Sequence, residues 1–285
     1  MAIQWPLVMF SLLAGASGGM LALAGLSELL GGSLPMRRRA CQVALGLLVI
    51  GGIASVAHLA SPLHAISAVT NLLSFSGISV ELMLLGACFI LGAAYLIVTR
   101  EGEGGGAAKA IAVISVVAGV AIGFFCGHGY VIEAQPTWNT ETLPFAYLGT
   151  SLALGAFAYA GVAWGMFKDK AADELGGKLK VFVLAAAIVD AIGIVAYAVA
   201  IGFDTVGAHA VLFWGGAFAV GAVCVVACAA ASMSAWGAKS PMAFATAGAV
   251  CACAGGICLR ALMWVAATGY VNLFATGIPS VIMNL

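Results

Sequence analysis

The chain has 285 residues, of which 64% are hydrophobic and only 8% charged, and its formal net charge is zero. A soluble domain is on average about 25% charged, so this composition excludes an ordinary soluble globule and indicates a protein that buries its apolar surface in membrane lipid. Without a basic balance there is no sign of a nucleic-acid partner, and none is expected.

Eight stretches are long enough to cross a membrane, since a transmembrane helix needs about 20 apolar residues. The segments between them carry turn and charge signals such as GGSLPMRRR and REGEGGG. Residues 1–36 contain no Lys or Arg, so the first stretch lacks the basic region of a signal peptide and is expected to be a retained helix. The predicted helices cover about 5–30, 38–59, 79–99, 108–128, 143–168, 179–201, 209–233 and 242–267.

These stretches predict an all-α integral membrane protein, a single domain of residues 1–285 built as a bundle of eight transmembrane helices. Small residues recur in the helices, as in LLAGASGGMLALAG, and they allow helices to pack closely in lipid. Pro6 and Pro144 each open a set of four helices, which suggests halves of about 1–128 and 129–285.

The basic residues predict the orientation of the bundle. Ten of the 11 Lys and Arg residues lie in or beside the odd-numbered loops, and none lies in an even-numbered loop or near a terminus. By the positive-inside rule, the odd loops are cytoplasmic and both termini lie outside. We therefore predict a multi-pass protein of the bacterial cytoplasmic (inner) membrane. The ten residues are Arg37, Arg38, Arg39, Arg100, Lys109, Lys168, Lys170, Lys178, Lys180 and Lys239.

The eight cysteines fall almost entirely in apolar segments. They include no C-x-x-C pair and no group that could ligate an iron–sulfur cluster. We expect them to be small packing residues, in a chain that carries no iron–sulfur cluster of its own. They are Cys41, Cys88, Cys126, Cys224, Cys228, Cys251, Cys253 and Cys258.

All four histidines fall on the predicted outer side of the membrane. For His64, His128 and His209, the simplest interpretation is that polar groups gather at helix ends, where water is present. His58 differs, because in SVAHLASPLHAI it continues an apolar run that ends only at Pro62. A structural and a functional role are equally open for it.

Three charged residues fall well inside predicted helices, where charge is costly and usually faces a partner or a wet cavity. Glu81 opens the third helix near the outer side. Arg260 lies roughly 10 Å below the outer end of the last helix, at about 1.5 Å per residue, so Glu81 is a candidate partner for it. Asp190 lies near the middle of the sixth helix, too deep for a direct pair with Arg260 unless the helices tilt.

Groups of this kind near the outer face suit quinol oxidation, which needs side chains that hydrogen-bond the ring oxygens and accept protons. His58, Glu81 and Arg260 are the candidates. Axial ligands for a haem would have to face each other near mid-membrane. Only His58 and His128 could pair, so no haem is expected. A transporter or channel of the inner membrane, using Asp190 and Gly-rich helices, is the alternative, and an anchor without a quinone site is a third class.

Four stretches resemble the DmsC-like membrane anchors of anaerobic dimethyl sulfoxide reductases. The likeness lies in QWPLVMFSLLAGASGGMLALA, in ASVAHLASPLHAISAVTNLLSFSGISVELMLLG, in QPTWNTETLPFAYLGTSLALG and in GGICLRALMWVAATGY. HLASP stands where the family has HLGSP, and the charged residue that often follows the proline is absent.

The resemblance implies an anchor that docks an iron–sulfur subunit of the four-cluster type and a molybdopterin catalytic subunit on its outer face. Such an anchor oxidises menaquinol and passes the electrons to the iron–sulfur subunit, without haem. The resemblance places the family's quinol-site histidine on His58, and Ser61 in the following turn is a further candidate for binding the quinol. It places the quinol-site glutamate on Glu81 and the arginine of the last helix on Arg260.

On this basis His58 is expected to accept a proton from one quinol hydroxyl, and Glu81 to support proton release to the outside. Arg260 either holds Glu81 ionised or binds a quinone oxygen. Trp138 and Asn139 are candidates for subunit docking in the fourth loop. A place in the interfacial aromatic belt is the alternative for Trp138.

Overall fold

The computed structural model describes residues 2–57, 70, 72–168, 179–235 and 237–267, and the backbone of two short strands near the C-terminus. In this part of the chain, eight helical segments are long and apolar enough to cross a membrane, which confirms the predicted eight-helix bundle. They are α1 (Trp5–Leu29), α2 (Leu34–Ala57), α4 (Gly77–Val98), α5 (Gly105–His128), α6 (Thr142–Met166), α8 (Leu179–Ile201), η2 (Val211–Cys224) continued by α10 (Val225–Met233), and α11 (Pro241–Val265). The short elements are η1 (Leu72–Ser74), α9 (Phe203–Ala208) and η3 (Gly237–Lys239).

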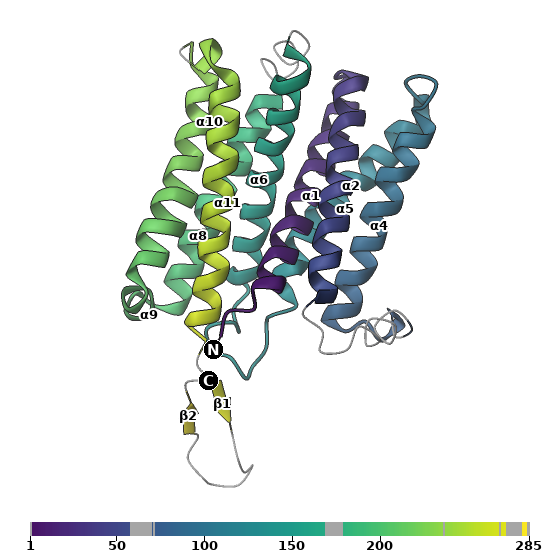
Figure 1. The fold of residues 1–285 in the computed structure, drawn as a ribbon. Helices are drawn as coiled ribbons and strands as arrows, with labels where there is room; N and C mark the ends of the chain where they lie inside the picture. The colour runs from purple at the N-terminus through teal and green to yellow at the C-terminus, as the bar shows by residue number, and fades with distance from the viewer. Residues whose placement is uncertain are drawn as a thin grey trace.

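The helices stand side by side as two groups, α1, α2, α4 and α5 in one and α6, α8, α10 and α11 in the other (Figure 1). Helix α1 joins the groups, because it packs against α5 and α2 on one side and α6 on the other. Whether the two groups are repeated halves stays a prediction.

The two ends of the bundle differ in charge. Helix α1 begins and α11 ends at the same end (Figure 1), which we call the terminal face. The opposite end carries Arg37, Arg38 and Arg39 in the first turns of α2, and we call it the basic face. Helix α2 starts at Leu34, four residues before its predicted start, so these arginines lie within the helix and not in the loop before it. That the terminal face is the outer one stays a prediction.

Glycine allows the backbones of α1, α5 and α6 to approach closely. A Cβ on Gly155 of α6 would lie 2.6 Å from the Cα of Gly19 in α1, and a Cβ on Gly119 of α5 would collide with the backbone of Gly18. Side chains at these positions would push the helices apart, so the small residues set the helix spacing, as expected for packing in lipid.

The seventh span differs from the predicted single helix over 209–233. The short helix α9 precedes it, and its first fourteen residues, η2, form a π-helix before α10 continues as an α-helix. A Cβ on Gly221 in η2 would lie 2.8 Å from the Cα of Gly255 in α11, so the two backbones nearly touch. Hydropathy does not distinguish π from α winding, because both satisfy the backbone internally and present the same apolar side chains to lipid.

A short β-hairpin follows α11, beyond the terminal face (Figure 1). Strand β1 (Gly269–Val271) pairs antiparallel with β2 (Val281–Met283), and Gly269 lies opposite Met283. The all-α prediction did not include this hairpin, because strands of three residues are too short to show an alternating pattern.

Candidate functional site

Two of the predicted site residues, Glu81 and Arg260, lie in the described part of the chain. Ser76 caps α4 by accepting a hydrogen bond from the Ser79 amide at 3.3 Å, so Glu81 sits just over one turn into that helix. Arg260 lies five residues before the end of α11. Both residues therefore belong to the terminal half of the bundle. His58, His64 and Ser61 fall outside the described residues.

Arg260 is fully buried among neutral groups. Its Nε donates to Ser11 Oγ in α1 at 2.9 Å, and its Nη1 donates to Thr150 Oγ1 in α6 and to the Gly256 carbonyl, both at 3.1 Å. The guanidinium lies over the ring of Tyr147, with Cζ 4.3 Å from the ring centroid. The positive charge is thus stabilised by dipoles and a ring face, and it connects α11 to α1 and α6.

Glu81 is partly buried and lies near a different set of groups. Its carboxylate is within hydrogen-bonding reach of the Cys126 thiol on α5. The described residues show no ion pair between Glu81 and Arg260, so the candidate direct pair is not formed in this structure. Helix packing explains the separation, because α4 contacts α5 and α2, whereas α11 contacts α6 and η2.

Four aromatic side chains from two helices and the α5–α6 connection pack together at the terminal face. Trp138 and Trp264 meet edge to face with ring centroids 5.0 Å apart, and Tyr130 lies 6.0 Å from Trp264 and 5.9 Å from Tyr147. Burial raises the pKa of Tyr130 well above its usual value, and the nearby Tyr147 and Glu81 raise it further. Tyr130 therefore remains a neutral phenol at physiological pH. It lies close enough to both Glu81 and Arg260 for their charges to act on it.

Trp138 does not have the role expected from the sequence. Only 5% of its side chain is exposed, and its indole Nε1 donates to the Met263 carbonyl at 2.8 Å. A buried side chain satisfied within its own chain belongs neither to a docking surface nor to an interfacial belt. Trp138 instead fixes the α5–α6 connection against the end of α11. Asn139, the other docking candidate, is exposed.

Asp190 is a buried charged residue near the middle of α8. It is 1% exposed, and neither of its carboxylate oxygens has a hydrogen-bond partner there. A Cβ on Gly149 would lie 2.6 Å from the Asp190 Cα, and the next residue, Thr150, binds Arg260. Asp190 and the Arg260 guanidinium therefore lie at one level beside α6, so the predicted depth difference is wrong. No ion pair joins them.

The histidines of the described segments lie at the terminal face. His128 stacks on Phe124 with ring centroids 5.8 Å apart, and its Nδ1 lies 3.6 Å from Glu141 Oε2. His209 is the C-cap of α9. Within the described residues, no group of three His, Cys, Asp or Glu side chains is placed to hold a metal ion.

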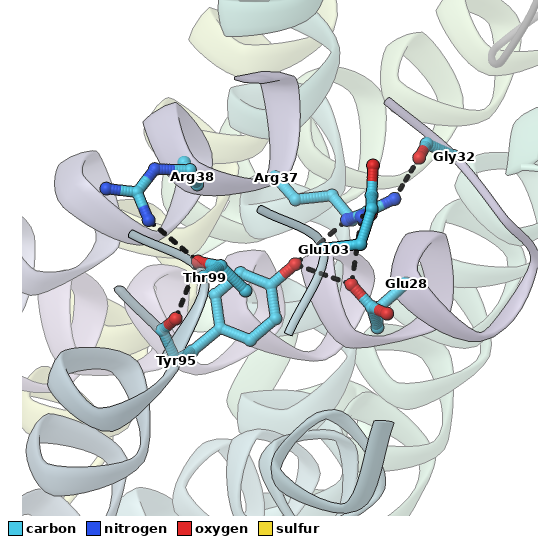
Figure 2. A network of polar contacts seen from close by, with 7 residues as sticks. All are labelled: Glu28, Gly32, Arg37, Arg38, Tyr95, Thr99 and Glu103. Carbon is cyan, nitrogen blue, oxygen red and sulfur yellow. Dashed lines mark hydrogen bonds and ion pairs between the residues drawn. The ribbon is translucent and has the colours of Figure 1, made fainter. Parts of the chain in front are cut away.

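A second polar network lies at the basic face, and the sequence analysis did not identify it (Figure 2). Arg37, 1% exposed, places Nη2 3.0 Å from Glu28 Oε2 and donates from Nε to the Tyr95 hydroxyl at 2.9 Å. Tyr95 in turn donates to Glu28 Oε2 at 2.7 Å, and Arg37 also pairs with Glu103 and donates to the Gly32 carbonyl. The network ties α1, α2, α4 and the loop before α5 together, and within it Arg37 is paired with both Glu28 and Glu103.

Sequence reasoning also missed the residues that hold Arg260. Ser11, Tyr147 and Thr150 lie six, five and eight residues from the helix ends at the terminal face. Their similar depth to Arg260 is a signal that could have found them. Glu28 and Arg37 flank a short connection between adjacent antiparallel helices, which likewise brings them to one level.

Comparison with known proteins agrees with the sequence motifs. The family model "DMSO reductase anchor subunit (DmsC)" matches residues 1–208, a range that includes Glu81 and Asp190 but ends before Arg260. The anaerobic dimethyl sulfoxide reductase chain YnfH of Escherichia coli (strain K12) is 30% identical over 163 residues, which cover 56% of this chain and 57% of YnfH. The chain thus matches little more than half the length of this curated relative. The family match spans most of the eight-helix bundle, and this multi-pass membrane protein belongs to the DmsC family of DMSO reductase anchor subunits.

Proposed function

We propose that this chain is the membrane anchor of a molybdenum oxidoreductase complex and oxidises menaquinol near the outer face of the membrane. Membership of the anchor family supports this function. The observation that carries it is that the terminal half contains two ionisable groups of opposite charge, the partly buried Glu81 carboxylate and the buried Arg260 guanidinium, and neither has an ion-pair partner among the described residues. Ionisable groups inside a membrane protein commonly mark a substrate or proton pathway.

Quinol oxidation gives up two electrons and two protons, and the residues of this chain would bind the ring and accept the protons. His58 takes the proton of one hydroxyl and Glu81 that of the other, which it releases to the outer side. Arg260 stays fixed by Ser11 and Thr150 and provides a positive field towards the developing quinone oxygen. Both electrons leave to a partner, because the cysteines are expected to hold no cluster.

The partners in this proposal are an iron–sulfur subunit that receives the electrons and a molybdopterin subunit that reduces the terminal acceptor. Both dock on the terminal face. The α5–α6 connection supports such docking, because Trp138 fixes it against α11 while Asn139 remains exposed. A rigid loop with polar groups on its surface costs little ordering entropy when it binds.

Fluorescence titration of membranes with a quinol-analogue inhibitor tests the proposal. We expect saturable binding to the wild type and its loss in His58→Arg and Glu81→Gln, with normal insertion of both variants. His128→Arg is the matched control, because His128 lies at the same face but contacts Phe124 and Glu141. No binding to correctly inserted wild type, in the assembled complex as well as the single chain, would leave a structural anchor.

One observation favours a transporter instead, namely that the Asp190 carboxylate at the centre of α8 has no hydrogen-bond partner among the described residues. The two functions predict opposite results for one pair of variants. Quinol oxidation that survives Asp190→Asn but not Glu81→Gln supports the anchor. Solute or ion flux into proteoliposomes that is lost in Asp190→Asn supports the transporter.

A further inference from the structure

A cavity of about 340 Å³ opens among the helices of the second group at the basic face. Its walls come from α6, α8, α10 and α11 and from the connection between α10 and α11. Glu81 and Arg260 are not among its lining residues, so the cavity is separate from the candidate quinol site.

The lining changes from apolar to polar along the helix axes. Phe157 lies nine residues before the end of α6, and Val183 and Ala245 each lie four residues after a helix start. These side chains form a wall roughly 6 Å or more inside the bundle, at about 1.5 Å per residue. Lys180 and Ser232 lie at the helix ends themselves, so the cavity has an apolar interior and a polar mouth.

The mouth has a positive charge that the described residues do not neutralise. Lys180 makes no ion pair there, whereas Arg37, at the same face, pairs with Glu28 and Glu103. The N-terminus of α11 also reaches the cavity at Pro241, and its N-cap Ser240 makes no side-chain capping bond. The positive end of the helix dipole thus adds to the lysine charge.

We propose that this cavity binds an anionic phospholipid, with the headgroup phosphate at Lys180 and part of an acyl chain against Phe157, Val183 and Ala245. The mouth lies where four membrane-spanning segments end, which is the level of lipid headgroups. Basic pockets between transmembrane helices recognise acidic lipid headgroups. An apolar interior behind a lysine that makes no ion pair with the described residues matches a charged head joined to a hydrocarbon chain better than it matches a free anion.

The test uses full-length protein in detergent, incubated with phosphatidylglycerol or phosphatidylcholine and analysed by native mass spectrometry. We expect one phosphatidylglycerol to be retained and phosphatidylcholine to be lost. Lys180→Gln should weaken phosphatidylglycerol binding about fivefold, from the attraction that one basic residue contributes, and Lys180→Arg should preserve it. Lys109→Gln is the matched control, because Lys109 is exposed near the start of α5, away from the cavity.

A second variant separates shape from charge. Ala160 lines the cavity and is 6% exposed, so Ala160→Phe should fill the interior and abolish lipid retention while Lys180 remains. Circular dichroism would confirm folding of both variants, and the wild-type comparison of the two lipids requires no variant. Equal retention of both lipids, displacement of phosphatidylglycerol by millimolar inorganic phosphate, or displacement by a quinol analogue would each overturn the proposal.

Discussion

The two halves of this bundle differ in the partners that they provide for a buried arginine. At the basic face, Arg37 is paired with Glu28 and Glu103 and hydrogen-bonded to Tyr95. At the terminal face, Arg260 is just as buried but is bound by neutral groups.

This difference indicates which end provides stability and which is available for chemistry. A buried charge whose partners are all present is strongly held in its place, and removing one partner leaves the other uncompensated. Glu81, Arg260 and Asp190 have no such closed set among the described residues. A group of this kind can change its protonation or bind a substrate without breaking an existing ion pair.

Replacing each buried arginine with methionine is the strongest test of this contrast. We expect Arg37→Met to lower the free energy of unfolding by about 3–5 kcal/mol, because it leaves the Glu28 carboxylate uncompensated. Arg260→Met should leave it unchanged or higher, because Ser11 and Thr150 already donate to backbone carbonyls of their own helices. Unfolding in detergent with increasing SDS measures both.

Quinol oxidation by the same two variants should show the opposite order of effects. We expect Arg260→Met to lose activity, and the folded fraction of Arg37→Met to keep it. Equal destabilisation by both substitutions would remove the distinction between the two faces and make Arg260 a structural residue.

Substitution of one tyrosine in each network compares the same two regions, with smaller expected effects on stability. Tyr95→Phe removes a hydroxyl that bonds both Glu28 and Arg37, and it should cost about 1.5–3 kcal/mol because the partners are charged. Tyr147→Phe removes a hydroxyl that donates to the Met263 thioether at 3.4 Å, a weak acceptor, and keeps the ring face under Arg260. It should cost less than about 1 kcal/mol. Thermal unfolding of the two variants in one detergent measures the difference, and a larger effect for Tyr147→Phe would contradict it.

Substitutions at Asp190 test whether a buried carboxylate without a hydrogen-bond partner among the described residues destabilises the fold. We expect Asp190→Leu, similar in volume and fully apolar, to raise the free energy of unfolding by about 1–2 kcal/mol, since the buried carboxyl has no hydrogen-bond partner to lose among the described residues. Asp190→Ala is the control for a newly created cavity. A loss of stability in the leucine variant would mean that a partner outside the described residues, or a bound ion, satisfies the carboxylate.

Trp138 is a residue of the terminal face that stabilises the fold, because its indole is hydrogen-bonded and packed. Trp138→Phe keeps much of the ring packing on Trp264 but loses the hydrogen bond to the Met263 carbonyl. We expect a loss of about 1 kcal/mol, measured by the same unfolding assay, and faster hydrogen exchange at the backbone amides of residues 135–140. Unchanged exchange would show that the loop is held by other contacts.

Amino-acid composition and hydropathy by themselves determined the eight spans and the charge difference between the two faces, while the helix ends shifted by a few residues, as at Leu34 of α2. These properties are local, because about 20 consecutive apolar residues cross a bilayer whatever their neighbours are. The family resemblance was likewise recognised from the motifs around His58, Glu81 and Arg260, because a motif depends only on the order of residues.

Only the tertiary structure decided which charges meet. Glu81 and Arg260 were candidate partners by depth, but depth along a helix does not determine which helices are neighbours, and α4 packs mainly against α5 and α2 whereas α11 packs mainly against η2 and α6. Trp138 was a candidate for docking or for the interfacial belt because it lies in a loop, yet its indole donates to the Met263 carbonyl of α11. Arg37 looked like a topology signal, and the structure places it in a closed network. Such pairings depend on rotation about each helix axis and on contacts between segments far apart in the chain, which hydrophobic length does not encode.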